Sequence, residues 1–206
     1  MRICGLNRKI HWLKSALTLY ILCSFFVLSG CTQDTLAENT KILQICGNSN
    51  FSILSGNTGT EATGTILVYD REEGMLGVRI ISSINVGVED WGGVAFYLPA
   101  GCSLGDIMCT YPETNESIEN NSPIEVWYSG SDDGEFDTVI EIGRSRDFKS
   151  TGGGSGTVVI DASYVCGNEQ KNIASSLKFS VECGARLENG NIIWGDEHNE
   201  ILVAIE

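Results

Sequence analysis

Four carboxylates in one short segment could bind a divalent cation. Residues 129–137 read SGSDDGEFD and lie between two strand-like segments. Ca²⁺ prefers clustered oxygen ligands, so calcium is the cofactor that this segment suggests. The candidate ligands are Asp132, Asp133, Glu135 and Asp137. Their spacing differs from that of an EF-hand loop, and the alternative is a solvated hairpin loop without a cation.

Aromatic side chains could stack on a ligand, because sugars present flat apolar C–H faces that pack on exposed rings. Trp127 and Tyr128 are adjacent in a strand-like segment, so one of them must point inward and the other outward. Core packing is the alternative for each ring. The candidates for ligand stacking are Trp91, Tyr111, Tyr128 and Trp194.

The sequence offers little for catalysis, and no catalytic residue is predicted. His198 has no neighbouring nucleophile, and the motif G-x-S-x-G is absent. The glycine-rich segment 151–157 leads into a strand-like segment, whereas a phosphate-binding loop opens a helix and carries a lysine. A carboxylate pair could hydrolyse a glycosidic bond, but with 27 Asp and Glu residues some pair is inevitable.

Five cysteines follow residue 31, and none of them forms a CxxC pair. With a single histidine in the same part of the chain, a zinc site is disfavoured. Cys102 and Cys109 bracket the loop-like segment 103–108, whose glycine can let its ends meet, and they form the predicted disulfide. The odd number leaves at least one thiol free or intermolecular.

The N-terminal residues have the pattern of an export signal. Four basic residues precede residues 15–28, an uncharged and mostly apolar run that is short for a transmembrane helix. The run ends in Leu28-Ser29-Gly30-Cys31, which resembles the lipobox of bacterial lipoprotein signal peptides. In that family a lipid is attached to the cysteine sulfur and the chain is cut just before it.

The lipobox resemblance implies a signal peptide at residues 1–30, lipidation of Cys31 and a lipidated tether at residues 31–40. The protein would then be extracytoplasmic, with the membrane as a partner through its lipid, and in the outer membrane if the host has one. A plain secretory signal and an uncleaved membrane anchor are the alternatives. From Cys31 onward nine basic residues stand against 27 acidic ones, a net charge of −18 that disfavours nucleic acid as a partner.

The remaining chain has the alternation of an all-β protein. Runs rich in valine, isoleucine and aromatic residues are separated by turn residues, and no window shows sustained helical periodicity. Strands are predicted at 42–46, 51–54, 65–70, 76–88, 93–98, 125–128, 139–142, 157–165, 176–183, 192–194 and 201–205. The prediction is a single antiparallel β-sandwich over residues 41–206, Ig-like or a cohesin-like jelly roll.

Residues 84–98 (INVGVEDWGGVAFYL) and Gly156–Ile160 resemble strands of cohesin-type sandwiches. Cohesins bind dockerin modules, and related sandwiches bind polysaccharide. The anchor, the sandwich and the lack of a nucleophile–base arrangement together predict a cell-surface, non-catalytic binding module for a polysaccharide or an extracytoplasmic protein. An envelope-acting carboxylate-based glycosidase and a structural lipoprotein of an envelope complex are the alternatives.

Overall fold

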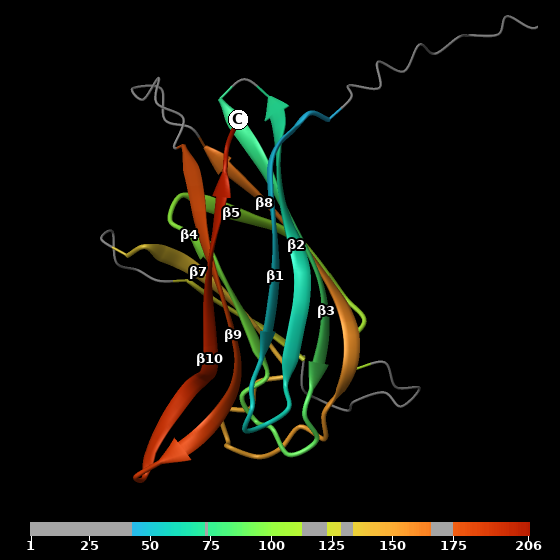
Figure 1. Ribbon diagram of the computed structural model, residues 1–206. Coiled ribbons are helices and arrows are strands. Elements are labelled where there is room, and N and C mark those ends of the chain that lie inside the picture. The colour runs from blue at the N-terminus through green and yellow to red at the C-terminus, as the bar shows by residue number, and fades with distance from the viewer. Residues whose placement is uncertain (1–42, 73, 113–122, 129–133, 166–174) are drawn as a thin grey trace, which may run out of the picture. The chain divides into compact units, whose positions relative to one another are not determined.

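The protein folds as two antiparallel β-sheets packed face to face (Figure 1). The computed structural model describes residues 43–206 except 73, 113–122, 129–133 and 166–174. These residues contain ten strands and no helix. The strands are β1 (Ile45–Leu54), β2 (Glu61–Glu72), β3 (Met75–Val86), β4 (Val94–Pro99), β5 (Cys102–Cys109), β6 (Ile124–Tyr128), β7 (Phe136–Ile142), β8 (Gly154–Val165), β9 (Ser176–Glu188) and β10 (Asn191–Ala204). The predicted β-sandwich is confirmed.

The two sheets mix strands from distant parts of the chain. Sheet A has the strand order β1-β2-β3-β8-β5, and sheet B has the order β10-β9-β4-β7-β6. Hairpins join β2 to β3 and β9 to β10, whereas β3 pairs with β8 and β4 with both β7 and β9. The chain therefore passes repeatedly from one sheet to the other, which brings sequence-distant loops to the same end of the sandwich.

The hydrophobic core lies between the sheets and follows from the period-two pattern. In β3 alternate side chains are buried, as Ile80 and Ile84 are, while the intervening Arg79, Ile81 and Ser83 are exposed. The largest fully buried side chains come from both sheets and include Phe96, Phe179, Ile66, Ile80, Ile84, Leu98, Ile140, Ile142 and Ile160. Burial of one such side chain contributes about 1.5–3 kcal/mol, so this cluster is the main source of stability.

Two observed strands each replace two predicted ones. The polar segment Gly47–Asn50 was expected to separate strands 42–46 and 51–54, but it lies inside β1, with Asn48 and Asn50 exposed. Likewise β10 runs through the expected break between 192–194 and 201–205, with a register shift between Trp194 and Glu197. A β-bulge accommodates such an irregularity without ending the strand, so turn-type residues do not mark strand ends here.

β5 is a strand that the sequence did not predict, and it shows that the predicted disulfide is wrong. Cys102 lies opposite Tyr164 and Cys109 opposite Val158, at the two ends of the strand, and both are free thiols. Eight extended residues span about 25 Å, whereas bridged cysteines have Cα atoms within about 7 Å. Gly105, interpreted as a turn residue, lies where the register shifts between Leu104 and Ile107.

The sandwich has two ends. At the N-terminal end the described chain begins at Leu43, and the N–H of Glu206 donates to the carbonyl of Cys46 at 2.8 Å. The connections 55–60, 87–93 and 143–153 lie at the opposite end, which we call the loop end. They contact one another, since the N–H of Gly87 donates to Thr60 Oγ1 at 2.9 Å and that of Ser145 to the carbonyl of Trp91 at 2.8 Å.

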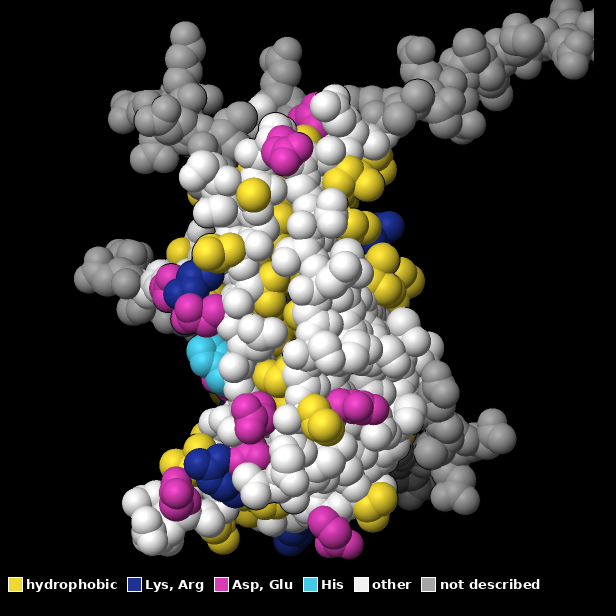
Figure 2. Space-filling model, viewed as in Figure 1, with side chains coloured by type: hydrophobic (Ala, Val, Ile, Leu, Met, Phe, Trp, Pro, Cys, Tyr) yellow, Lys and Arg dark blue, Asp and Glu magenta, His cyan; other side chains and the backbone are white. Residues whose placement is uncertain are grey.

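One face of the sandwich is largely uncharged. Figure 2 shows that the charged side chains of this face gather mainly on the side formed by β9 and β10, while hydrophobic side chains line the seam between β10 and β1. The strands β1 and β10 approach each other closely at this seam. A Cβ on Gly47 would lie 2.1 Å from the carbonyl oxygen of Ala204, so only glycine leaves room for the approach. Glycine at position 47 therefore allows the edges of the two sheets to meet.

Candidate functional site

The connection between β7 and β8 folds back over the loop end of sheet B. It begins at Gly143, whose φ of +66° favours glycine and whose N–H donates to the carbonyl of Pro123 at 2.8 Å. Farther along, the N–H of Thr151 donates to the carbonyl of Asp90 at 3.4 Å. The connection therefore lies against the start of β6 and the β3–β4 loop, which places Arg144 and Arg146 over the outer face of sheet B.

Asp90 fixes the loop that carries Trp91. Its carboxylate is 1% exposed and accepts hydrogen bonds from Thr60 Oγ1 at 2.5 Å and from three backbone N–H groups. These belong to Gly92 at 2.8 Å, Gly93 at 3.1 Å and Ala185 at 3.2 Å. In the described part of the chain no ion pair joins this carboxylate to a cation, so the hydrogen bonds alone compensate its burial.

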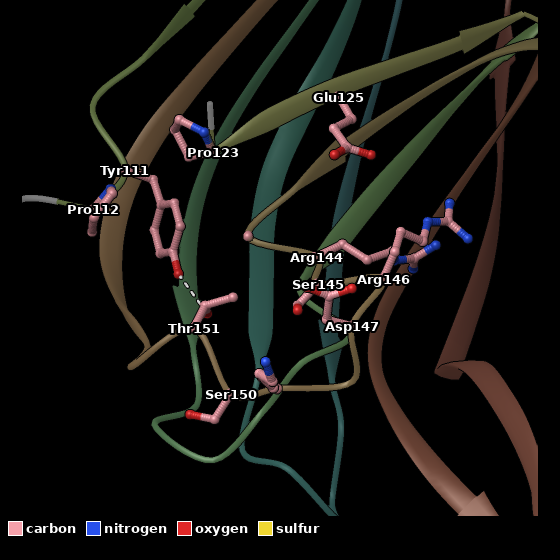
Figure 3. Close-up of a pocket in the computed structure, with 12 residues that line it drawn as sticks. Tyr111, Pro112, Pro123, Glu125, Arg144, Ser145, Arg146, Asp147, Ser150 and Thr151 are labelled. Carbon is pink, nitrogen blue, oxygen red and sulfur yellow. Dashed lines mark hydrogen bonds between the residues drawn. The ribbon is translucent and has the colours of Figure 1, made fainter. Parts of the chain in front are cut away.

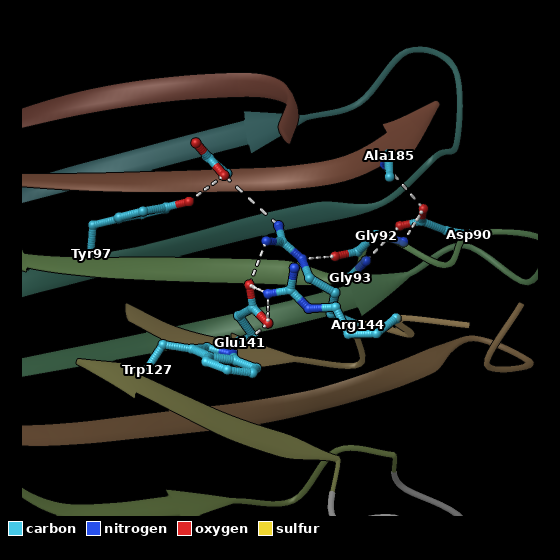
Figure 4. Close-up of polar contacts among 10 residues, drawn as sticks. Asp90, Gly92, Gly93, Tyr97, Trp127, Glu141, Arg144 and Ala185 are labelled. Atoms are coloured by element: carbon cyan, nitrogen blue, oxygen red, sulfur yellow. Dashed lines mark hydrogen bonds and ion pairs between the residues drawn. The ribbon is translucent and has the colours of Figure 1, made fainter. Parts of the chain in front are cut away.

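Glu141 is the centre of a buried charged network (Figure 4). Its side chain is 4% exposed and accepts from Arg144 Nη1 at 2.7 Å and from Trp127 Nε1 at 2.9 Å. Arg146 Nη2 donates to both carboxylate oxygens, at 2.5 and 2.6 Å. One carboxylate thus orients two guanidinium groups and one indole. Glu141 belongs to β7, which lies between β4 and β6 in sheet B.

Arg144 is the more deeply buried of the two arginines. Its side chain is 3% exposed, and its Nε donates to the carbonyl of Gly92 at 2.7 Å. Its Nη2 has no hydrogen-bond partner among the described residues and lies 3.8 Å from Glu182 Oε2. Glu182 accepts from the hydroxyl of Tyr97 at 2.7 Å. Burial, followed by the interaction with Glu182, raises the pKa of Tyr97, so this hydroxyl remains a donor at neutral pH.

Arg146 lies between two indoles. Its guanidinium carbon is 5.1 Å from the ring centroid of Trp127 and 4.8 Å from that of Trp194, and the guanidinium of Arg144 is 4.9 Å from Trp194. Trp194 continues the cluster through an edge-to-face contact with Trp91 at 5.0 Å. We call Trp127, Arg146, Trp194, Arg144 and Trp91 the arginine–tryptophan stack. Each such cation–π contact contributes about 0.5–2 kcal/mol, so the stack fixes its own geometry.

A pocket of about 600 Å³ adjoins the stack (Figure 3). Arg144 and Arg146 belong to both, and Glu125 of β6 lines the pocket two residues before Trp127 on the same face of the strand. The other lining residues are Tyr111, Pro112, Pro123, Gly143, Ser145, Asp147, Lys149, Ser150 and Thr151. The lining combines basic, acidic and hydroxyl groups, which suits a polar ligand with many oxygens.

The four predicted stacking residues have different surroundings. Trp91 and Trp194 come together but pack mainly on each other and on Phe148. Tyr111 is 5% exposed and lines the pocket, with its hydroxyl 3.4 Å from Thr151 Oγ1. Tyr128 is 69% exposed but lies outside the stack and the pocket lining. Their role in binding stays a prediction.

The predicted calcium ligands are only partly described. Asp132 and Asp133 lie outside the described residues. Glu135 forms an ion pair with Lys178 at 2.9 Å, and Asp137 accepts from the N–H of Gly101 at 3.0 Å. In the part of the chain that the structure describes, no group of three or more side chains is arranged to hold a metal ion. Calcium binding at this segment stays a prediction.

The sequence interpretation missed Trp127, Glu141, Arg144 and Arg146. A signal for the arginines was present, since three of the nine basic residues after Cys31 lie within residues 144–149. Trp127 could not be chosen over Tyr128 without the register, which places Trp127 opposite Val139 and next to Glu141 on the outer face of β7. Glu141 has no distinguishing sequence signal among the 27 acidic residues.

The predicted signal peptide, Cys31 and residues 31–40 of the tether lie outside the described residues, as does Cys166. Among the residues that the structure describes, no helix is long and apolar enough to cross a membrane. No family model and no curated protein matches the chain.

Proposed function

We propose that this protein is a lipid-anchored, non-catalytic binding module that takes a polysaccharide at the loop end of sheet B. The observation that carries the proposal is that Trp127 is exposed and yet held in one orientation. Its side chain is 49% exposed, yet its indole N–H is bound to Glu141 and Arg146 covers its ring. An exposed indole held in one orientation is a surface on which the apolar face of a sugar can stack.

Rigidity distinguishes Trp127 from the neighbouring exposed ring of Tyr128. Ordering a free side chain on binding costs about 0.5–1.5 kcal/mol. The hydrogen bond and cation–π contact of Trp127 already order its ring in the free protein, so binding does not incur this entropic cost again. Tyr128, 69% exposed, makes no side-chain hydrogen bond or ring contact with another described residue. Trp127 is therefore the better platform, although both rings lie on the same short strand.

The pocket supplies the polar part of the site. Sugar hydroxyls need both hydrogen-bond donors and acceptors, and Glu125, Asp147 and Lys149 offer both at the pocket wall. A few polar groups beside an apolar surface are typical of ligand sites in proteins. Trp127 and the pocket are joined by Arg146, which contacts the indole and lines the pocket.

The position of the site also fits an anchored module. The described chain begins at Leu43, at the N-terminal end of the sandwich, whereas the stack and the pocket lie at the loop end. The twelve residues of β3, which run from one end to the other, span about 40 Å. Leu43, which follows the predicted tether in the sequence, is therefore at the end opposite to the site, which suits an anchored module that takes a ligand outside the cell.

Retention on immobilised polysaccharides tests the proposal. The full-length chain, purified in detergent, is passed over a panel of neutral and acidic polysaccharides, and we expect retention on at least one. Trp127→Ala should weaken that retention at least about fivefold, because stacking contributes about 1 kcal/mol or more. Trp127→Phe keeps a ring but loses the N–H donor, so it should have a smaller effect.

Tyr128→Ala is the matched control, because it removes an exposed ring from the same strand without touching the stack. Equal loss in the two alanine variants, or no retention on any polysaccharide, would contradict the proposed site. Release of sugar products during incubation would instead indicate the glycosidase alternative. Capture of one envelope protein without polysaccharide binding would indicate the protein-binding alternative.

A further inference from the structure

The site holds an unusual share of the basic groups of an acidic protein. After Cys31 the chain carries nine basic and 27 acidic residues, and Arg144, Arg146 and Lys149 all line the pocket. At physiological ionic strength charges are screened beyond about 8 Å. A bound ligand therefore experiences the lining residues more strongly than the acidic remainder of the chain.

Arg146 keeps most of its hydrogen-bonding capacity. Its bonds to Glu141 all come from Nη2, and no hydrogen bond to a described residue comes from its Nε or Nη1. The side chain is 45% exposed and its plane is fixed by the indoles of Trp127 and Trp194. A guanidinium with free N–H donors held in a fixed orientation can donate a charge-assisted hydrogen bond to a carboxylate.

Lys149 is a second available cation. Its side chain lines the pocket and is exposed, and no ion pair joins it to an acidic group among the residues that the structure describes. By contrast, Lys178 contacts both Glu135 and Glu200 and Arg79 contacts Asp161. An unpaired lysine in a protein with a threefold excess of acidic residues is a group through which an anion can be attracted.

Acidic groups in the same lining restrict the kind of anion. Glu125 and Asp147 line the pocket and can accept hydrogen bonds from hydroxyl groups, but they repel an anion that has no hydroxyls. The ligand that satisfies all of these groups combines a carboxylate with several hydroxyls and an apolar C–H face. A sugar acid has this combination.

We infer that the polysaccharide bound at this site contains a carboxylate-bearing sugar, whose carboxylate is held by Arg146 and Lys149 while its ring stacks on Trp127. The inference rests on the proposed polysaccharide binding and adds the charge class of the ligand. The carboxylate accepts a charge-assisted hydrogen bond from the free Nη1 of Arg146, and the sugar hydroxyls donate to Glu125 and Asp147.

The test compares matched pairs of polysaccharides that differ in charge alone. Uronate-containing polysaccharides and the same polymers after reduction of their carboxylates to primary alcohols are offered to the full-length chain. We expect at least about tenfold tighter binding of the acidic member of a pair. Lys149→Gln should reduce this preference, and Arg146→Lys should reduce it further, because lysine keeps the charge and can still pair with Glu141 but has no second nitrogen in a fixed plane to donate to the ligand.

Arg79→Gln is the matched control, since it removes one positive charge from the outer face of sheet A, away from the site. It should leave the acidic preference unchanged. Equal binding of both members of a pair would overturn this inference and leave the proposed polysaccharide binding intact. Equally tight binding of a sulfated polysaccharide without carboxylates would also overturn it. No binding of any polysaccharide would overturn both.

Discussion

The carboxylate of Asp90 accepts a hydrogen bond from the backbone N–H of Ala185 at 3.2 Å, across 95 residues of sequence. The bond joins the β3–β4 loop to β9, so the loop that carries Trp91 is fixed to the strand that carries Glu182. Two further N–H donors and the hydroxyl of Thr60 complete the contacts of this carboxylate. The geometry of the loop end therefore depends on one buried acidic residue.

Asp90→Ala should destabilise the protein by at least about 2 kcal/mol. The substitution leaves a hydroxyl and three backbone N–H groups without their acceptor, and an unsatisfied buried donor costs about 1–3 kcal/mol. Urea denaturation measures the free energy of unfolding. Asp161→Ala is the control, because it removes a partly exposed ion pair with Arg79 and should cost less than about 1 kcal/mol. Equal effects of the two substitutions would contradict the role assigned to Asp90.

Glu141→Gln should destabilise the protein by about 3–5 kcal/mol, because it leaves the buried guanidinium of Arg144 without its nearest carboxylate. Tryptophan fluorescence should change at the same time, since Trp127 loses an ionised acceptor for its indole N–H. Glu200→Gln breaks an exposed pair with Lys178 and should change the stability far less, because solvent screens the pair. A fluorescence spectrum unaltered by Glu141→Gln would count against the network.

Asp196 should make the stability depend on pH in the acid range. Burial acts to raise its pKa, but hydrogen bonds from Ser55, Asn57 and Arg186 outweigh burial and hold the pKa below its usual value. The folded pKa is thus lower than the unfolded one. The stabilisation is present above the unfolded pKa of about 3.9 and is lost as the pH falls through the folded pKa.

Thermal unfolding measured between pH 6 and pH 2 tests the role of Asp196. Asp196→Asn should be less stable than the wild type near pH 6, and the difference should shrink as the pH falls. A difference that stays constant over this range would show that the ionised form of Asp196 has no special stabilising role.

The described cysteines should differ in reactivity. Burial is the main cause that raises the pKa of both Cys102 and Cys183 to about 12, so neither forms a thiolate at pH 8 in the folded protein. Cys46 is partly exposed. Alkylation at pH 8 followed by peptide mapping should modify Cys46 first and the other two only after denaturation. Recovery of a Cys102–Cys109 disulfide from the native protein would contradict the structure.

Cys31→Ser should release the protein from the membrane fraction, because the resemblance to the lipobox places the lipid on that sulfur. Cell fractionation and mass spectrometry of the N-terminal peptide measure retention and modification. Unchanged retention and processing in the variant would refute lipidation. Ser29→Gly keeps a small residue ahead of the cysteine and should leave the protein in the membrane fraction.

The sequence by itself determined the fold class. Alternation in segments such as Arg79–Val86 reports directly on which side chains face a core, because successive side chains of a strand point to opposite faces. It determined the element boundaries less well. Asn48 and Gly195 were interpreted as turn residues, but they lie within long strands in which bulges and solvent-facing positions accommodate them.

Only the tertiary structure decided the site. Trp127 and Tyr128 have equivalent positions in the sequence, and the pairing of β6 with β7 determines which ring meets Glu141. Arg146 and Trp194 are far apart along the chain, and the fold of the β7–β8 connection brings them within 4.8 Å. Local sequence records the periodicity of each strand, whereas such contacts arise from the order of strands in the sheets, which single-sequence periodicity does not encode.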